Sequence, residues 1–196
     1  MSAASEPVVS LDLKDRAGLP DALGILLRDY PRAGWSADGN FGGLVSFWLD
    51  RHLNFRRIMT MMQSETEQLL DRNLDPQVHA ARLSRLGSGF VSDLQGHHQI
   101  EDAHYFPVLA RTEPRIAAGF DLLDRDHQAL DEHLDRFVKG ANAVLRKIAA
   151  PADHHAAAGR FASDLAHLNA LLDRHLVDEE ELVVPVILRH GAGGLG

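Results

Sequence analysis

The segment LLDRHLVDEEELVVPVIL (residues 171–188) has apolar residues at helical spacing, yet it carries a histidine and an acidic run before it meets a proline. His175 precedes Glu179 by four residues and Pro185 by ten. Residues four apart lie on one face of a helix, about 6 Å from each other, so this imidazole and this carboxylate can reach one point. Such a pair is a natural chelator for a metal ion such as iron.

The segment QGHHQIEDAHYFPVL (residues 95–109) repeats the arrangement, with His97, Glu101 and a proline at the same intervals, 78 residues earlier. A lone histidine precedes each pair: His52 in WLDRHLNF, and His127 in LLDRDHQAL, 75 residues later. The chain therefore reads as two similar halves, each of which contributes one lone histidine and one histidine–glutamate pair.

Long helices account for most of the chain. Helical spacing and breakers predict four helices, at residues 44–70, 76–111, 114–147 and 153–190. Asp75 and Pro76 are typical of an N-cap and first helical residue, Thr112 is a candidate cap for the third helix, and GAGGLG ends the fourth. No segment alternates as a strand does, and the links are short. We expect an all-α fold, an up-down-up-down four-helix bundle.

Outside the bundle, residues 20–29 are expected to form a short helix and YPRAGWSADGNFGG (residues 30–43) a loop. The predicted organisation is an N-terminal extension, a bundle domain and a flexible tail, at residues 1–43, 44–190 and 191–196.

Composition limits the classes of function. A chain of 196 residues, 45% of them hydrophobic, can bury one sizeable core. The net charge of −8 argues against nucleic acid or an anionic membrane surface as a partner. The absence of cysteine excludes disulfides, thiolate zinc sites and cysteine-ligated iron–sulfur clusters. The sequence shows neither a signal peptide nor an apolar run of membrane-spanning length, so a soluble cytoplasmic protein is expected. Twelve histidines are unusually many for such a chain.

A bundle with this pseudo-symmetry would bring two histidines and one carboxylate from each half to its centre. That set suits two metal ions a few ångströms apart, with both carboxylates bridging them. The predicted ligands are His52, His97, Glu101, His127, His175 and Glu179.

The order H…HxxxE…H…HxxxE, with a proline after each pair, resembles the hemerythrin-like HHE domain, and HHQIEDAHYFP is especially similar to that family's second helix. The resemblance implies a bundle around a non-haem di-iron centre with an oxo or hydroxo bridge. It further implies one iron at His52 and His97, a second at His127 and His175, and bridging carboxylates from Glu101 and Glu179.

The chain departs from oxygen-carrying hemerythrins in two places. Asp131 stands where their third helix has a second histidine, and the carboxylate of the fourth helix follows its histidine by four residues instead of five. Water, Asp131, His98 or Tyr105 is then available to complete the coordination. Sites of this more open kind suit binding or sensing of oxygen or nitric oxide, or peroxide decomposition. The sequence does not decide whether the protein is an enzyme, and it identifies no protein partner.

Three other functions are compatible with the sequence. One is iron sensing or buffering, with metal occupancy as the signal. Another is a metal-free helical interaction module. The third, a ferritin-like di-iron enzyme, requires two ExxH motifs, of which the chain has only EDAH at residues 101–104.

Other residues near the motifs have ordinary interpretations. Trp48, Phe55, Met59 and Met62 are expected to pack in the core, and His104 in the core or above the site. The expected charged outer faces of the helices include Asp102, Asp178, Glu180 and Glu181, of which Asp102 and Glu180 flank predicted ligands and are candidates to orient them.

Overall fold

The computed structural model describes residues 10–150 and 153–195. Parts of the predicted N-terminal extension (1–9), of the link before the fourth helix (151–152) and of the tail (196) lie outside these residues. Within the described part, every regular element is helical: α1 (Ile25–Asp29), η1 (Arg32–Ala37), α2 (Gly43–Leu70), α3 (Pro76–Ile100), η2 (Glu101–Tyr105), α4 (Phe106–Thr112), η3 (Pro114–Ile116), α5 (Ala117–Ala149) and α6 (His155–His190).

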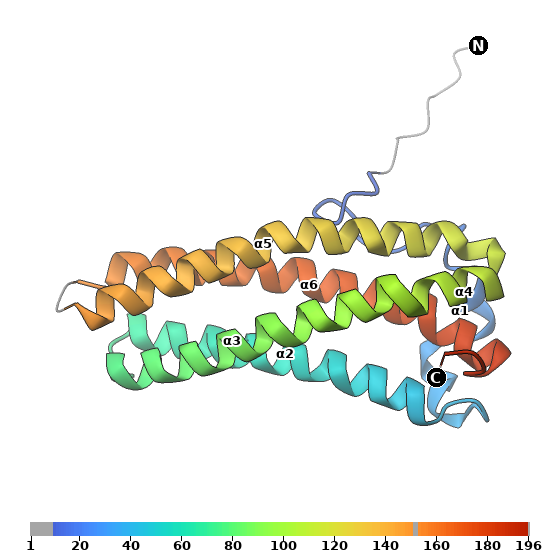
Figure 1. Ribbon diagram of the computed structural model, residues 1–196, viewed down its shortest axis with the longest axis horizontal. Coiled ribbons are helices and arrows are strands. Elements are labelled where there is room, and N and C mark those ends of the chain that lie inside the picture. The colour runs from blue at the N-terminus through green and yellow to red at the C-terminus, as the bar shows by residue number, and fades with distance from the viewer. Residues whose placement is uncertain (1–9, 151–152, 196) are drawn as a thin grey trace, which may run out of the picture.

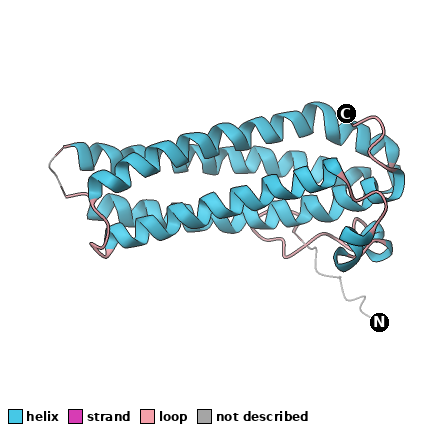
Figure 2. Cartoon of the chain, turned by 90° about the horizontal axis from the view of Figure 1, so that it is seen from below, coloured by secondary structure: helices cyan, strands magenta, loops and turns pink. Residues whose placement is uncertain are grey.

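The four long helices form a bundle (Figure 1). Helix α2 packs against α3 and α6, and α5 packs against the same two neighbours, so the helices form a closed ring. Consecutive helices run in opposite directions and are joined by short links at the ends of the bundle (Figure 2). The predicted all-α, up-down-up-down bundle is confirmed. No helix in the described residues is both long and apolar enough to cross a membrane.

The helix boundaries follow local chemistry. The Asp75 carboxylate accepts hydrogen bonds from the N–H groups of Gln77 (2.9 Å) and Val78 (3.1 Å), which caps α3 as predicted. Gly191 ends α6 with a φ of 76°, a left-handed conformation that favours glycine. The prediction for Thr112 was wrong, because its hydroxyl donates to the Val108 carbonyl within α4.

The N-terminal segment, which we define as residues 10–41, lies along the bundle, and its α1 packs against α6 (Figure 1). The expected loop at residues 30–43 instead contains η1, a 3₁₀ helix. The reason is Trp35, which is buried and donates its indole N–H to the Tyr30 carbonyl at 2.8 Å. A buried aromatic side chain with a satisfied polar atom fixes this part of the chain onto the bundle.

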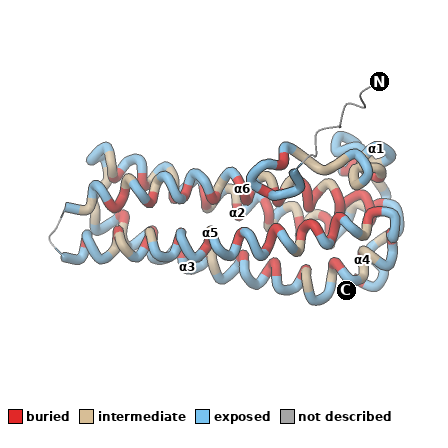
Figure 3. The backbone as a smooth tube through the Cα atoms, turned by 90° about the horizontal axis from the view of Figure 1, so that it is seen from above, coloured by how far each residue is buried: buried red, intermediate tan, exposed pale blue. Residues whose placement is uncertain are grey.

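The apolar core divides into two clusters, and α2, α5 and α6 each pass from one to the other, whereas α3 contributes to the first cluster and α4, its continuation beyond η2, to the second. The first, the link-end cluster, lies toward the end of the bundle where α2 connects to α3 and α5 to α6 (Figure 1), and includes Phe55, Phe90, Phe137 and Phe161. The second, the terminal-end cluster, lies toward the end that holds the C-terminus, and includes Trp48, Phe106, Phe120 and Val183. The predicted core residues Trp48, Phe55, Met59 and Met62 are all buried. Buried residues follow the inward face of each helix, and near its C-terminus α6 is buried on almost every side (Figure 3). A band of polar side chains separates the two clusters, with His52 between Trp48 and Phe55 on α2.

A wide π-helical turn, η2, interrupts the second helix of the bundle directly after Ile100. The N–H of Phe106 donates to the carbonyl of Glu101, five residues back. Pro107 follows this turn, and a proline in a regular helix would lose one hydrogen bond and clash with the carbonyl four residues before it. The wider turn accommodates the proline. The second motif also contains a proline, Pro185, but α6 continues through it without a π turn.

Candidate metal centre

All six predicted ligands lie in the polar band, and a seventh side chain, His98, joins them. Among the described residues, two groups have potential ligand atoms within 4.8 Å of one another: His52, His97, Glu101 and Glu179 form one, and His98, His127 and His175 form the other. All seven residues are buried. The two groups follow the two halves of the sequence with two exceptions: Glu179, from the second half, lies in the first group, and His98, from the first half, lies in the second group. We call these groups the first and the second half of the site.

In the first half, the Nε2 atoms of His52 and His97 are 3.0 Å apart. Glu101 Oε1 lies 3.0 Å from His97 Nε2, which is the contact expected of residues one helical turn apart. Glu179 Oε2 lies 3.4 Å from His52 Nε2. Two imidazole nitrogens and two carboxylates from different helices therefore face one small volume.

In the second half, the Nε2 atoms of His127 and His175 are 3.2 Å apart. The ring of His98 stacks on that of His127, with centroids 3.9 Å apart and planes 9° from parallel. Three imidazoles from α3, α5 and α6 therefore meet here.

Both carboxylates connect the two halves. Glu101 directs Oε1 to His97 in the first half and Oε2 to His127 in the second, at 3.0 and 3.7 Å. Glu179 Oε2 lies 3.4 Å from His52 Nε2 and 3.6 Å from His175 Nε2. Each carboxylate is thus placed where it could bridge two ions, one in each half.

Several polar atoms of this band are buried without a hydrogen-bond partner in the described residues. They are both ring nitrogens of His98, both carboxylate oxygens of Glu101, Nδ1 of His175 and Oε2 of Glu179. Buried polar atoms in proteins are nearly always paired, and each exception calls for an explanation such as an ion. The atoms of His98, Glu101 and Glu179 come from the second and the fourth helix of the bundle and lie among the other potential ligands, so bound cations fit the site well. Nδ1 of His175 instead faces Asp126 Oδ2, 3.5 Å away.

The electrostatics of the site favour the neutral form of His97 and His98, whereas burial of His52 is outweighed by attraction from Glu179 and Glu180, which raises the pKa of this histidine. Burial, reinforced by the nearby His52 and His175, lowers the pKa of His97 to about 3 against the opposing attraction of Glu179. Burial and the neighbouring histidines also bring the pKa of His98 well below its ordinary value. A metal-binding histidine has to be neutral, so these two rings already have a free lone pair at neutral pH.

The pKa values of Glu101 and Glu179 are shifted in opposite directions. Burial and repulsion from Glu179 raise the pKa of Glu101 well above its ordinary value. Burial also acts to raise the pKa of Glu179, but attraction from His52, His97 and His175 outweighs it and lowers this pKa. Repulsion between two buried carboxylates is what a bound cation would relieve.

Other side chains hold the outer nitrogens of the histidines. Asp102 Oδ1 lies 2.8 Å from His127 Nδ1, and Glu180 Oε1 lies 3.0 Å from His52 Nδ1. The indole N–H of Trp48 donates to Glu179 Oε1. Carboxylate contacts of this kind fix the orientation of a metal-binding imidazole and make it a better donor.

Two expectations about the outer face were wrong. Asp178 and Glu180 are buried, because arginines pair with both of them: Arg174 lies 2.5 Å from Asp178, and Arg56 lies 2.8 Å from Glu180. Glu181 is half-buried. Arg174 lies one helical turn before Asp178 on α6, but Arg16 and Arg56, which also pair with these carboxylates, come from distant parts of the chain and cannot be predicted from a helical period.

The three protein candidates for completing the coordination are placed differently. His98 belongs to the second group, whereas Asp131 is exposed on α5. Tyr105 packs its ring on Trp48, with centroids 4.8 Å apart. His104, expected in the core or above the site, is exposed. The extra residue in the π turn rotates later positions by about 100°, so Tyr105 faces inward in its place.

A pocket of about 200 Å³ reaches the first half from the surface, between α2 and the junction of α3 with η2. His97 and Glu101 line it, together with Leu44, Phe47, Trp48, Arg51, Gly96, Ile100 and Tyr105. Phe47 and Ile100 are 59% and 44% exposed, so the rim is apolar. A water molecule occupies about 30 Å³, so the pocket has room for small ligands.

Comparison with known proteins gives one match. The family model described as the hemerythrin HHE cation-binding domain matches residues 43–187. No curated protein and no solved structure matches the chain.

Proposed function

Because the chain belongs to the hemerythrin HHE cation-binding family, we propose that it is a non-haem di-iron protein that binds or senses oxygen or nitric oxide, or decomposes peroxide. In this proposal His52 and His97 hold one iron, His98, His127 and His175 hold the other, and Glu101 and Glu179 bridge them.

The observation that carries the proposal is the position of the two buried carboxylates, each within 4.0 Å of histidine nitrogens from both halves. A single ion would need ligands from only one half of the site, so carboxylates that reach both halves favour two ions. Imidazole nitrogen and carboxylate oxygen are donors that suit iron, and a bound iron pair would supply a redox-active centre for small ligands.

The uneven distribution of histidines supports a ligand position in the first half. Two histidines face that half and three face the other, so the first ion would have fewer protein ligands. The 200 Å³ pocket also opens onto His97 and Glu101, which belong to the first half. Its apolar rim, formed by residues such as Phe47 and Ile100, would restrict water and admit small apolar ligands such as oxygen.

Iron sensing or buffering remains a second candidate, and the unpartnered buried atoms favour it. Without metal, Glu101 and His98 leave four polar atoms unsatisfied in the core, which costs stability. Metal binding would therefore stabilise the fold, and occupancy itself would act as the signal. Peroxide turnover by the iron-loaded protein above that of free iron would favour catalysis. Stabilisation by metal without turnover would favour sensing or buffering.

Metal analysis of protein produced in iron-supplemented cells without a histidine tag tests the proposal. We expect about two irons per chain. His175→Ala should remove much of the iron, and His98→Ala should lower the content toward about one per chain, because the second half loses a ligand. His167→Ala is the matched control, since His167 is exposed on the same helix as His175.

Each alternative has its own outcome. A His175→Ala protein with a full complement of iron would contradict the ligand assignment as a whole. Two irons in His98→Ala would show that His98 is not a ligand and would leave the other assignments standing. A wild-type protein without metal would return the chain to the class of helical interaction modules. Location in the cytoplasm stays a prediction.

A further inference from the structure

Arg16, in the N-terminal segment, is a buried cation that binds two helices of the bundle at once. Its side chain is 1% exposed. Its Nη1 and Nη2 donate to the two oxygens of Asp126 on α5, and its Nε donates to Asp178 on α6 at 2.8 Å. Arg174 donates to the other oxygen of Asp178, so two arginines balance two carboxylates. Bidentate arginine–carboxylate pairs fix geometry more firmly than other ion pairs.

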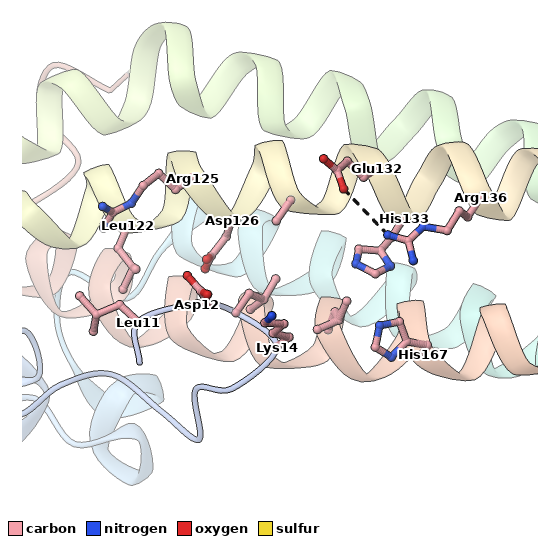
Figure 4. Close-up of a pocket in the computed structure, with 13 residues that line it drawn as sticks. Leu11, Asp12, Lys14, Leu122, Arg125, Asp126, Glu132, His133, Arg136 and His167 are labelled. Atoms are coloured by element: carbon pink, nitrogen blue, oxygen red, sulfur yellow. Dashed lines mark ion pairs between the residues drawn. The ribbon is translucent and has the colours of Figure 1, made fainter. Parts of the chain in front are cut away.

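Asp126 continues this connection to the candidate metal centre. Its Oδ2 lies 3.5 Å from Nδ1 of His175, whose Nε2 faces His127 at 3.2 Å. Figure 4 shows Asp126 pointing from α5 toward the N-terminal segment, with Leu11, Asp12 and Lys14 on the opposite side. These residues line a surface pocket of about 490 Å³ beside the connection. The bidentate bond to Arg16 leaves Asp126 little freedom to turn away from His175.

Arg32 makes an equivalent connection to the first half. This arginine, in η1, donates from Nη1 to Glu180 Oε2 at 2.5 Å and stacks over the ring of Trp35, 4.6 Å from its centroid. Glu180 Oε1 in turn lies 3.0 Å from His52 Nδ1. Arg56 of α2 donates to the same Oε1 atom at 2.8 Å.

We propose that the N-terminal segment is a working part of the metal centre: Arg16 and Arg32 are positioning residues that hold Asp126 and Glu180 against His175 and His52. The inference rests on the proposed function, because those histidines must be ligands. It goes beyond the family match, which begins at residue 43 and includes neither arginine. One arginine serves each half, so a single segment orients one ligand of each ion.

The consequence is a metal centre whose retention depends on residues far from it in sequence. Loss of groups that orient metal-binding histidines typically weakens metal binding by roughly 10- to 100-fold. We therefore expect Arg16→Gln and Arg32→Gln each to speed the loss of bound metal to a chelator by about tenfold or more. The charge-transfer absorption of the iron-loaded protein should shift as well, because the donor strength of His175 or His52 changes.

Arg28→Gln is the matched control. Arg28 is exposed in the same segment and, among the described residues, its side chain donates only to the Asp21 carbonyl, at 3.1 Å. The rate of metal loss and the absorption spectrum of Arg28→Gln should equal those of the wild type. Arg16→Lys and Arg32→Lys restore the charge without the two-pronged geometry, so they should recover part of the loss. A merely structural role would lower the melting temperature of the metal-free protein without moving the spectrum.

The proposal can be tested even if one of the two variants fails to fold. Arg16→Gln leaves two buried carboxylates with one arginine, so it is the variant at risk of misfolding. The Arg32 side chain is 45% exposed and Arg56 still pairs with Glu180, so Arg32→Gln is expected to fold. A folded Arg32→Gln protein with wild-type release rate and spectrum would overturn the proposal and leave the di-iron assignment standing. Wild-type protein that binds no metal would overturn both.

Discussion

The close approach of α5 and α6 at Gly119 gives a direct test of the packing beside the metal centre. A Cβ atom added at Gly119 would lie 2.8 and 2.9 Å from the two methyl groups of Leu182. Carbon atoms prefer about 3.5–4.0 Å, so Leu182 would have to move by roughly 0.7 Å or more. Leu182 is fully buried, with other core side chains around it.

Two opposing effects set the size of the change in Gly119→Ala. Replacement of glycine by alanine in a helix stabilises by up to about 1 kcal/mol. Overpacking a filled core costs about 1–3 kcal/mol. We expect net destabilisation of roughly 1 kcal/mol, equivalent to about 2–4 °C in melting temperature for a chain of this length.

Gly89→Ala isolates the helix effect. Gly89 is exposed on α3, and nothing lies within 4 Å of an added Cβ. This variant should be more stable than the wild type by about 0.5–1 kcal/mol. The assay is thermal and chemical denaturation of the metal-free proteins. Equal stabilisation by both substitutions would refute the close contact between Gly119 and Leu182.

The same variant also reports on the site, because Leu182 lies three residues after Glu179 on α6. A shift of Leu182 would move that turn of the helix and the carboxylate it holds. We expect Gly119→Ala to retain metal less tightly than Gly89→Ala, measured as the rate of metal loss to a chelator.

Two further predictions concern the ligand pocket and the end of the bundle. Gly96→Leu should place a side chain in the 200 Å³ pocket and slow azide or nitric oxide binding several-fold at unchanged metal content. Gly89→Leu, at an exposed position elsewhere on α3, should leave the binding rate unchanged. Equal rates in both variants would place the entry route elsewhere. Glu113 binds Arg115 and His190, and Arg115 is the main cause that lowers the pKa of this carboxyl to about 2. Its contribution to stability is therefore complete above the ordinary carboxyl pKa of 4.5 and disappears as the pH falls toward 2. Glu113→Gln should therefore lower the free energy of unfolding at pH 7 by about 1 kcal/mol, and the difference from wild type should vanish near pH 2; a difference independent of pH would contradict the assignment.

Much of the fold and of the candidate site could be predicted from sequence, because both depend on local periodicity. The long helices and the convergence of both histidine–glutamate pairs follow from residues three or four apart on one face. The Asp75 cap follows from an aspartate placed directly before a proline. Arg16 could not be predicted in the same way. It precedes its partners Asp126 and Asp178 by 110 and 162 residues, and no period relates them.

The π turn marks another limit of periodicity. A straight helix would place His104, seven residues after His97, near the site, but the inserted residue places Tyr105 there instead. Pro107 was the available signal, because a proline inside a helix requires some local adjustment. Pro185 shows that this signal is insufficient, since α6 has the same spacing without a π turn.

The position after each motif histidine explains why two similar halves produce an uneven site. His98 follows His97, and its counterpart after His175 is Leu176, which is fully buried in the link-end cluster. The position therefore faces inward in both halves, because the buried face of a bundle helix spans 100° or more. A leucine there adds to the apolar core, whereas a histidine adds a third imidazole to the opposite half. The choice of one residue at an inward position thus gives one half of the site two histidines and the other three, although the HxxxE motif itself is repeated without change.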